Sequence, residues 1–105
     1  MEFKRILEAY EMCIEELCSS IDYSKAAFEM KTDNVAFSKI FHEMAMDELK
    51  HAGYIKSMIE KTVESMTHDN KIIDEFKVLF EYKNDNYYDK LSKAKVMVQY
   101  YEGKA

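Results

Sequence analysis

The sequence predicts an all-α protein, an antiparallel helical hairpin followed by a C-terminal helical segment. Three observations support this fold class. The chain of 105 residues has no proline and only two glycines, so it lacks the breaks that strands and tight turns require. Apolar residues recur at alternating spacings of three and four, the period of an amphipathic helix. The length fits a single domain, residues 1–105, whose stability would benefit from a partner.

The first predicted helix spans about residues 3–31. Its apolar face is interrupted at Ser24 and consists of Phe3, Leu7, Tyr10, Ile14, Leu17, Ile21 and Phe28. The short polar run Thr32-Asp33-Asn34 follows, and these residue types cap helix N-termini. Because the connection is short, we expect the first two helices to pack as an antiparallel hairpin.

The second predicted helix spans about residues 35–66 and ends at the polar residues 67–70, which supply the next break and cap. The C-terminal segment, residues 71–102, carries apolar residues at helical spacing, but the polar run Lys83-Asn84-Asp85-Asn86 favours a break near 83–86. We interpret this segment as one kinked helix or as two shorter helices.

The charge pattern argues against nucleic acid and membranes as partners. The 15 basic and 20 acidic residues give a net charge of -5, and the two signs are interleaved along the chain. No apolar run approaches the roughly 18 residues of a membrane helix. The opening Met1-Glu2-Phe3-Lys4 does not begin a signal peptide. We therefore expect a cytoplasmic protein.

Two cysteines, Cys13 and Cys18, lie on the first predicted helix. Their spacing of five turns them about 140° apart around the helix axis, so they cannot readily form a disulfide with each other. We expect two buried thiols in a reducing compartment. Two cysteines are also too few for a four-thiolate metal site within the chain.

Glu48 and His51 form a Glu-x-x-His motif on the second helix, and both interrupt its apolar stripe. The stripe consists of Phe37, Phe41, Met44, Glu48, His51, Ile55, Met58, Thr62 and Met66. A spacing of three puts the carboxylate and the imidazole one turn apart on the same face. Burying an ionised carboxylate is costly unless an opposite charge receives it, so we expect a metal ion here. The alternative is an exposed polar notch on a partly buried helix.

Glu16 belongs to a second stripe, beside the main apolar face of the first helix. The other members of this stripe are Ala9, Cys13, Ser20, Tyr23 and Ala27. Most of these side chains are small, which leaves room for an ion beside the carboxylate and lets neighbouring helices approach closely. The first helix is therefore expected to pack against more than one neighbour.

Together these residues resemble the ferritin-like superfamily, in particular its encapsulated-ferritin and rubrerythrin-like branches. The resemblance rests on Glu16, Tyr23 and the run Asp47-Glu48-Leu49-Lys50-His51-Ala52, and it covers about residues 12–59. It implies that Glu16 is a terminal carboxylate ligand, that Glu48 bridges two irons and that His51 is a terminal imidazole ligand. It also places Tyr23 beside the ligands, as a hydrogen-bond donor or in electron transfer. The alternative for Tyr23 is a core aromatic.

The chain holds one such set of ligands, whereas a ferritin-like core uses two sets from four helices. The resemblance therefore implies that homodimerisation completes both the four-helix core and a site for two iron ions per dimer. Assembly beyond the dimer is left open. Manganese and zinc are alternative metals, since carboxylate and imidazole ligands suit them as well.

The implied function is that of a ferroxidase, an oxidoreductase that oxidises iron(II) to iron(III) with dioxygen or peroxide, in iron handling, iron storage or oxidative-stress defence. Its catalytic residues would be Glu16, Glu48, His51 and Tyr23. The alternative is a non-catalytic helical oligomer whose metal is structural or absent. Residues 99–105 do not resemble the tail that docks encapsulated ferritins to a shell protein, so a place inside a protein nanocompartment stays open. His42 and His68 are expected at the surface, without a metal role.

Overall fold

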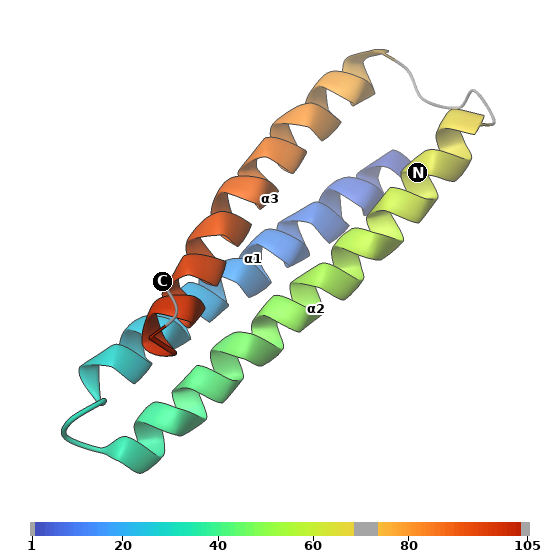
Figure 1. Cartoon of the computed structure of the whole chain (residues 1–105). Coiled ribbons are helices and arrows are strands. Elements are labelled where there is room, and N and C mark those ends of the chain that lie inside the picture. The colour runs from blue at the N-terminus through green and yellow to red at the C-terminus, as the bar shows by residue number, and fades with distance from the viewer. Residues whose placement is uncertain (1, 69–73, 104–105) are drawn as a thin grey trace.

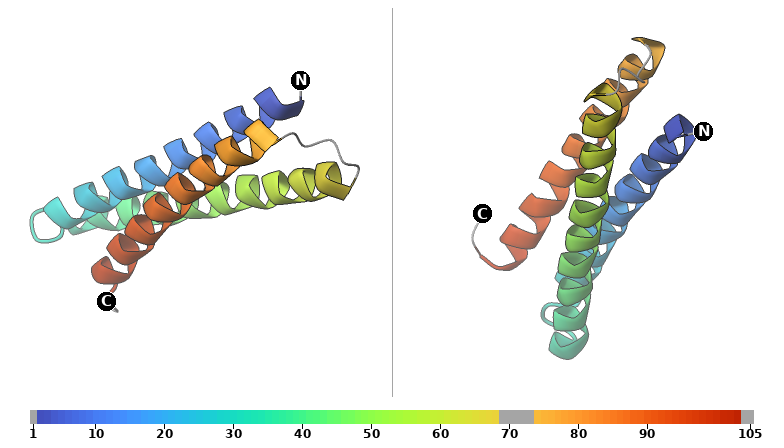
Figure 2. Two further views of the ribbon diagram at one scale, coloured as in Figure 1. Left: turned by 90° about the horizontal axis from the view of Figure 1, so that it is seen from above. Right: turned by 90° about the vertical axis from the view of Figure 1, so that its right-hand side faces the viewer.

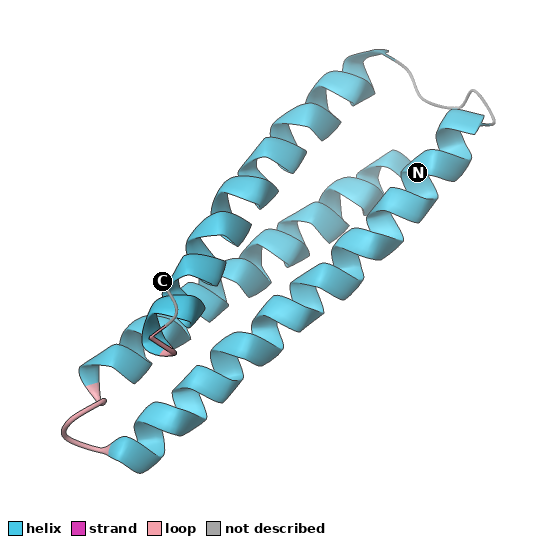
Figure 3. Cartoon of the chain, viewed as in Figure 1, coloured by secondary structure: helices cyan, strands magenta, loops and turns pink. Residues whose placement is uncertain are grey.

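The structure, a computed structural model, describes residues 2–68 and 74–103. These residues form three helices and no strand, which confirms the all-α prediction: α1 (Glu2–Glu29), α2 (Val35–His68) and α3 (Asp74–Tyr101). They make an elongated body of 55 × 19 × 17 Å. Figure 1 shows α1 and α2 as an antiparallel hairpin with α3 beside them, and Figure 3 shows loop only at the α1–α2 turn and after α3. Within the described residues, no helix is long and apolar enough to cross a membrane.

The α1–α2 turn begins earlier than predicted. Helix α1 ends at Glu29 rather than at residue 31, and residues 30–33 form the turn. The backbone N–H of Asn34 donates to the Met30 carbonyl at 2.9 Å, which closes this turn. The side-chain Oδ1 of Asn34 then accepts a hydrogen bond from the backbone N–H of Phe37 at 3.2 Å, as an N-cap residue does. The expected polar cap is thus present, with Asn34 as the capping residue.

The second and third helices also differ from their predicted bounds. Helix α2 continues to His68, so residues 67–68 are helical, while the predicted cap at 69–70 and the predicted start at 71 lie outside the described residues. Helix α3 is continuous, and the predicted break near 83–86 is wrong. The reason is that polar side chains of this run have partners on α1. Lys83 pairs with Glu11, and the Tyr10 hydroxyl donates to Asn84 Oδ1 at 3.2 Å.

Helices α1 and α2 meet along a seam of small side chains. The seam consists of Cys13, Ser20 and Ala27 on α1 and of Ser38, Ala45 and Ala52 on α2, all of them buried. Hydrogen bonds cross the seam at each level. Ser38 Oγ donates to the Ala27 carbonyl at 2.6 Å, Ser20 Oγ to the Ala45 carbonyl at 2.7 Å and Cys13 Sγ to the Ala52 carbonyl at 3.2 Å. The second stripe predicted for the first helix therefore packs against α2.

Helix α3 covers one side of the hairpin, and no other described element covers the opposite side (Figure 2). The core lies between α3 and the hairpin. Leu17 and Ile14 of α1 belong to the same buried cluster as Phe76, Phe80 and Tyr87 of α3. Aromatic contacts continue along the α1–α3 interface, with ring centroids 4.1 Å apart for Phe3 and Phe76 and 5.9 Å apart for Tyr10 and Phe80. The hairpin thus has a covered face and an uncovered face.

Candidate metal centre

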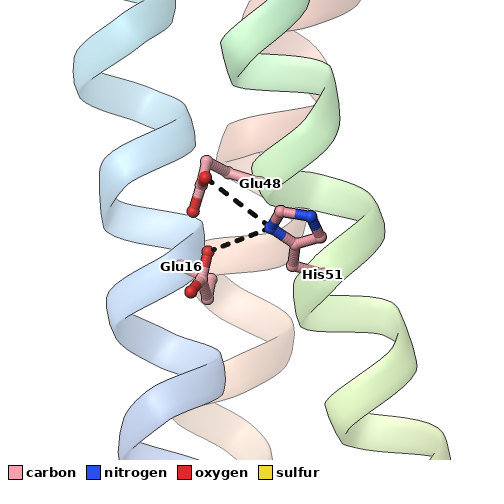
Figure 4. Close-up of side chains that lie close together, drawn as sticks. All are labelled: Glu16, Glu48 and His51. Carbon is pink, nitrogen blue, oxygen red and sulfur yellow. Dashed lines mark ion pairs between the residues drawn. The ribbon is translucent and has the colours of Figure 1, made fainter.

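Glu16, Glu48 and His51 come together on the uncovered face of the hairpin. Figure 4 shows Glu16 from α1 and the other two side chains from α2 pointing toward one another, with α3 behind them. Nδ1 of His51 lies 3.7 Å from Oε2 of Glu16 and 3.7 Å from Oε1 of Glu48. One ligand atom from each residue lies within 4.8 Å of the others, and no other His, Cys, Asp or Glu trio in the described part of the chain meets this condition.

The seam of small side chains sets the register that joins these three residues. Its hydrogen bonds hold Cys13 opposite Ala52 and Ser20 opposite Ala45. Glu16 lies between Cys13 and Ser20 along α1. Glu48 lies between Ala45 and Ala52 along α2. The two carboxylates therefore face each other across the hairpin. The spacing of three then adds His51 on the same face of α2.

The expectation that Glu48 and His51 are buried is wrong for the single chain. The His51 side chain is 54% exposed, and those of Glu16 and Glu48 are 31% and 22% exposed. The apolar stripe around them is partly open, with Phe37 53% and Met58 70% exposed, while Met66 at its end is buried. The physical reason is that α2 packs on α1 through its seam residues, which lie beside the predicted stripe. The middle of the stripe, where Glu48 and His51 lie, is consequently not covered by α3, whereas Met66 at its end joins the core cluster that contains Phe76 of α3.

The electrostatics of the trio favour a bound cation. Oε2 of Glu16 is buried and has no hydrogen-bond partner. Its distance of 3.7 Å to His51 Nδ1 is longer than a hydrogen bond. A buried carboxylate oxygen without a partner costs free energy, which a metal ion would recover. Carboxylate and imidazole together are donors for iron, manganese or zinc. Three donor groups leave at least one position of even a tetrahedral ion for water or for a ligand from a second copy.

Tyr23 packs against an aromatic neighbour on α2. It is half-buried on α1, and its ring stacks against Phe41 of α2 with centroids 6.1 Å apart. Among the described residues, no hydrogen bond joins its hydroxyl to Glu16, Glu48 or His51. The role of Tyr23 beside the ligands therefore stays a prediction.

The other two histidines lie outside the trio. His42 was expected at the surface, but its side chain is only 12% exposed, because the end of α3 covers it. Its ring stacks on Tyr101 with centroids 4.2 Å apart, and its Nε2 lies 3.4 Å from Oε2 of Glu102. His68 is exposed at the end of α2. The expectation about the thiols is met for Cys13, which is buried, whereas Cys18 is only half-buried.

A buried lysine is the feature that the sequence did not reveal. Lys56 is buried on α2, and its Nζ lies 2.6 Å from Oε1 of Glu60. The ammonium group also lies over the rings of Tyr87 and Tyr88. Burial lowers the pKa of Lys56, but the hydrogen bond with Glu60 and nearby acidic groups outweigh it, so the pKa is raised. The spacing of four between Lys56 and Glu60 was a signal for the pair, but not for its burial.

Comparison with protein-family models, with curated proteins and with solved structures finds no match to this chain. The resemblance to the ferritin-like superfamily therefore stays a prediction that rests on the residues named above. Of these, Glu16, Glu48 and His51 are adjacent in space, and Tyr23 stacks against Phe41.

Proposed function

We propose that two copies of this chain form a shared di-iron site and oxidise iron(II) to iron(III) there. The observation that carries the proposal is the convergence of Glu16, Glu48 and His51, including a buried carboxylate oxygen without a hydrogen-bond partner, on a face that no other described helix covers. Each copy offers two carboxylates and one imidazole. Two copies offer the four carboxylates and two imidazoles of ferritin-like di-metal bundles.

The surroundings of the trio support a second copy as the partner. Exposed apolar side chains flank the trio on the hairpin, among them Met12, Phe37 and Met58. Large exposed apolar side chains that share one face are typical of an interaction site. Twofold dimers are the commonest assemblies, and their interfaces pair the same patch on both subunits. A twofold axis near the trio would complete the four-helix core and the ligand set together.

The shape of the uncovered face supports a dimer in which the α1–α2 turns of the two copies lie at opposite ends. A hollow of about 220 Å³ lies on one side of the trio, lined by residues that include Ala9, Ile55 and Met58. Met58 is seven residues after His51, and Phe41 is seven residues before Glu48. A twofold axis perpendicular to the helices at the trio would therefore set Phe41 of one copy near the hollow of the other. Such an interface would be complementary to itself.

The proposed reaction needs the ligands to hold two iron(II) ions as neighbouring substrates. Glu48 would bridge them, while Glu16 and His51 would each complete the coordination of one ion. Carboxylate oxygens stabilise the harder ferric product. Two iron(II) ions give up two electrons, which with two protons reduce dioxygen to hydrogen peroxide or peroxide to water. Iron handling, iron storage or defence against oxidants would use this activity, and manganese or zinc are the alternative metals.

The test is an aerobic oxidation assay with matched variants. Anaerobic protein receives two iron(II) ions per dimer, air is admitted, and the ferric absorbance is followed. We expect fast oxidation by the wild-type protein and by Glu43→Ala, whose carboxylate is exposed on α2 outside the trio. Glu48→Ala should be no faster than iron in buffer, since a bridging carboxylate serves both ions. Equal rates for the wild type and Glu48→Ala would refute the proposal.

The second candidate is a non-catalytic helical oligomer with a structural metal or none. The exposed apolar face favours it independently of any chemistry, because that face needs a partner in either case. The same assay separates the two candidates. Self-association without air-dependent ferric absorbance would favour the structural oligomer.

A further inference from the structure

A row of oxidisable side chains crosses the protein from the trio to the outer surface of α3. It starts at Cys13, which lies one helical turn before Glu16 on α1. The Cys13 thiol is fully buried and donates to the carbonyl of Ala52, the residue after His51. The thiol is thus linked both to the helix of Glu16 and to the backbone beside His51.

Two tyrosines of α3 continue this row. Tyr87 is buried in the same core cluster as Cys13, and burial together with the neighbouring Cys13 raises the pKa of Tyr87 to about 12. The Tyr87 ring meets the ring of Tyr88 edge-on, with centroids 5.1 Å apart and an interplanar angle of 79°. Tyr88 is exposed. The thiol, the buried phenol and the exposed phenol therefore follow one another toward solvent.

The ion pair of Lys56 and Glu60 lies near both tyrosines. Lys56 Nζ is 5.3 Å from the Tyr87 ring centroid and 5.2 Å from that of Tyr88, and it holds Oε1 of Glu60 at 2.6 Å. The Glu60 charge also contributes to the raised pKa of Tyr87, which puts the carboxylate within electrostatic reach of the phenol. Because Glu60 is exposed, a proton that it accepts can pass to water. A phenylalanine at position 87 would fill the same space and would avoid the free-energy cost of burying a hydroxyl group.

We propose that Cys13, Tyr87 and Tyr88 form an electron-transfer route between the candidate metal centre and the surface of α3. Its use rests on the proposed oxidation of iron by dioxygen or peroxide. When a centre that has reacted with the oxidant lacks one iron(II), the missing electron comes from Tyr87 by tunnelling past Cys13, whose thiol keeps its proton and is not itself oxidised. The phenolic proton of Tyr87 passes to Glu60, which leaves a neutral phenoxyl radical.

The remaining steps return both tyrosines to their resting state. Tyr88 gives one electron to the Tyr87 radical and releases its own proton to water, while Glu60 returns a proton to Tyr87. A soluble one-electron reductant, such as a small thiol, then restores Tyr88 at the surface. The route would thus carry oxidising equivalents away from the metal ligands.

The test replaces the metal centre by a photo-oxidant, so that it does not depend on iron binding. A ruthenium polypyridyl complex is attached to the exposed His51 in a background of His68→Gln and Tyr54→Phe. The second change removes an exposed phenol one turn from the label. A light flash with a soluble electron acceptor generates ruthenium(III), and a spin trap followed by peptide mass spectrometry locates the tyrosyl radical. We expect trapping at Tyr88.

Two matched variants on α3 decide the outcome. Tyr87→Phe should lower the yield or rate of the Tyr88 radical by about tenfold or more, whereas Tyr82→Phe, at an exposed position of the same helix, should leave it unchanged. Tyr88 oxidation that is insensitive to Tyr87→Phe would overturn the route, as would equal trapping at Tyr82 and Tyr88. Failure of the iron chemistry would appear separately, as the absence of ferric absorbance in protein whose route is intact.

Discussion

The two faces of the α1–α2 hairpin are both apolar, but only one of them is covered. On the face toward α3, Leu17 and Phe76 are buried in the core cluster. On the opposite face, Phe37 and Met58 are exposed although their spacing along α2 is that of core residues. Apolar periodicity therefore identifies surfaces that need a partner and does not say whether the partner belongs to the same chain. The candidate metal ligands lie on the face that no other described helix covers.

The largest expected effect is a difference between the covered and the uncovered face in how much each contributes to the free energy of unfolding. Leu17→Ala should lower the free energy of unfolding by about 2–5 kcal/mol, because it opens a cavity in the covered core. Met58→Ala should change the free energy of unfolding of the dilute monomer by less than about 0.5 kcal/mol, as expected for an exposed side chain. Urea denaturation at low protein concentration measures both values.

Met58→Ala should instead weaken self-association, which is measured by sedimentation over a range of concentrations. If Met58→Ala destabilised the dilute monomer as much as Leu17→Ala does, the claim that only the covered face stabilises the single chain would be wrong.

A second prediction concerns the charge on the uncovered face. In a metal-free dimer, like charges about 4 Å apart would repel by roughly 4 kcal/mol at an effective dielectric near 20, and proton uptake would relieve part of this. Glu48→Gln should therefore lower the dissociation constant of the metal-free dimer by about tenfold, close to 1.4 kcal/mol, while it abolishes iron oxidation. Analytical ultracentrifugation measures the constant. The control is Glu43→Gln at an exposed position of α2, which should not tighten the dimer.

A third prediction uses the ionisation of the buried seam. Burial raises the pKa of Cys13 from 9.0 to about 11, and the neighbouring Glu16 adds to this while Lys56 opposes it. Below pH 9 the thiol is protonated in both the folded and the unfolded chain. Between pH 9 and about pH 11 the unfolded chain loses this proton first, so the folded state loses stability in that range.

Cys13→Ser keeps a hydroxyl donor for the Ala52 carbonyl and does not ionise in this range. The variant should therefore lose less stability than the wild type when urea midpoints are compared at pH 9 and pH 11. Equal losses in the two proteins would show that the thiol has the same pKa in the folded and the unfolded state, so that burial does not raise it.

The smallest expected effect concerns Ser24, on the covered face. Its hydroxyl is buried and has no hydrogen-bond partner, which carries a desolvation cost. Ser24→Ala should raise the free energy of unfolding by up to about 1 kcal/mol without changing metal binding or self-association. Thermal denaturation is sufficient to detect the direction. A destabilised variant would indicate that the hydroxyl has a partner after all.

The sequence was sufficient for the helices and for the three residues that meet. The three-and-four spacing predicted all three helices, and the Glu-x-x-His spacing placed Glu48 and His51 on one face. The sequence did not reveal how α2 is rotated about its own axis, and therefore which of its residues face α1. The small seam residues Ser38, Ala45 and Ala52 carry little hydrophobicity, so the larger residues of the stripe appeared to be the core. Close backbone approach and hydrogen bonds across the seam determined the packing instead.

The polar run of α3 and His42 show the same limit. Lys83 and Asn84 suggested a break because their partners, Glu11 and Tyr10, lie more than seventy residues away in sequence. His42 appeared to be a surface residue because the stacking of Tyr101 on it depends on where α3 ends. Local spacing carries no information about such long-range contacts.

The most direct test of the shared site is native mass spectrometry of the wild-type protein with iron(II) under anaerobic conditions. Glu16, Glu48 and His51 of one chain provide half of the proposed ligand set. The proposal predicts two metal ions on the dimer and none on the monomer, because only the dimer holds both halves. One iron ion bound to an intact monomer would contradict it, since the site would then be complete within a single chain.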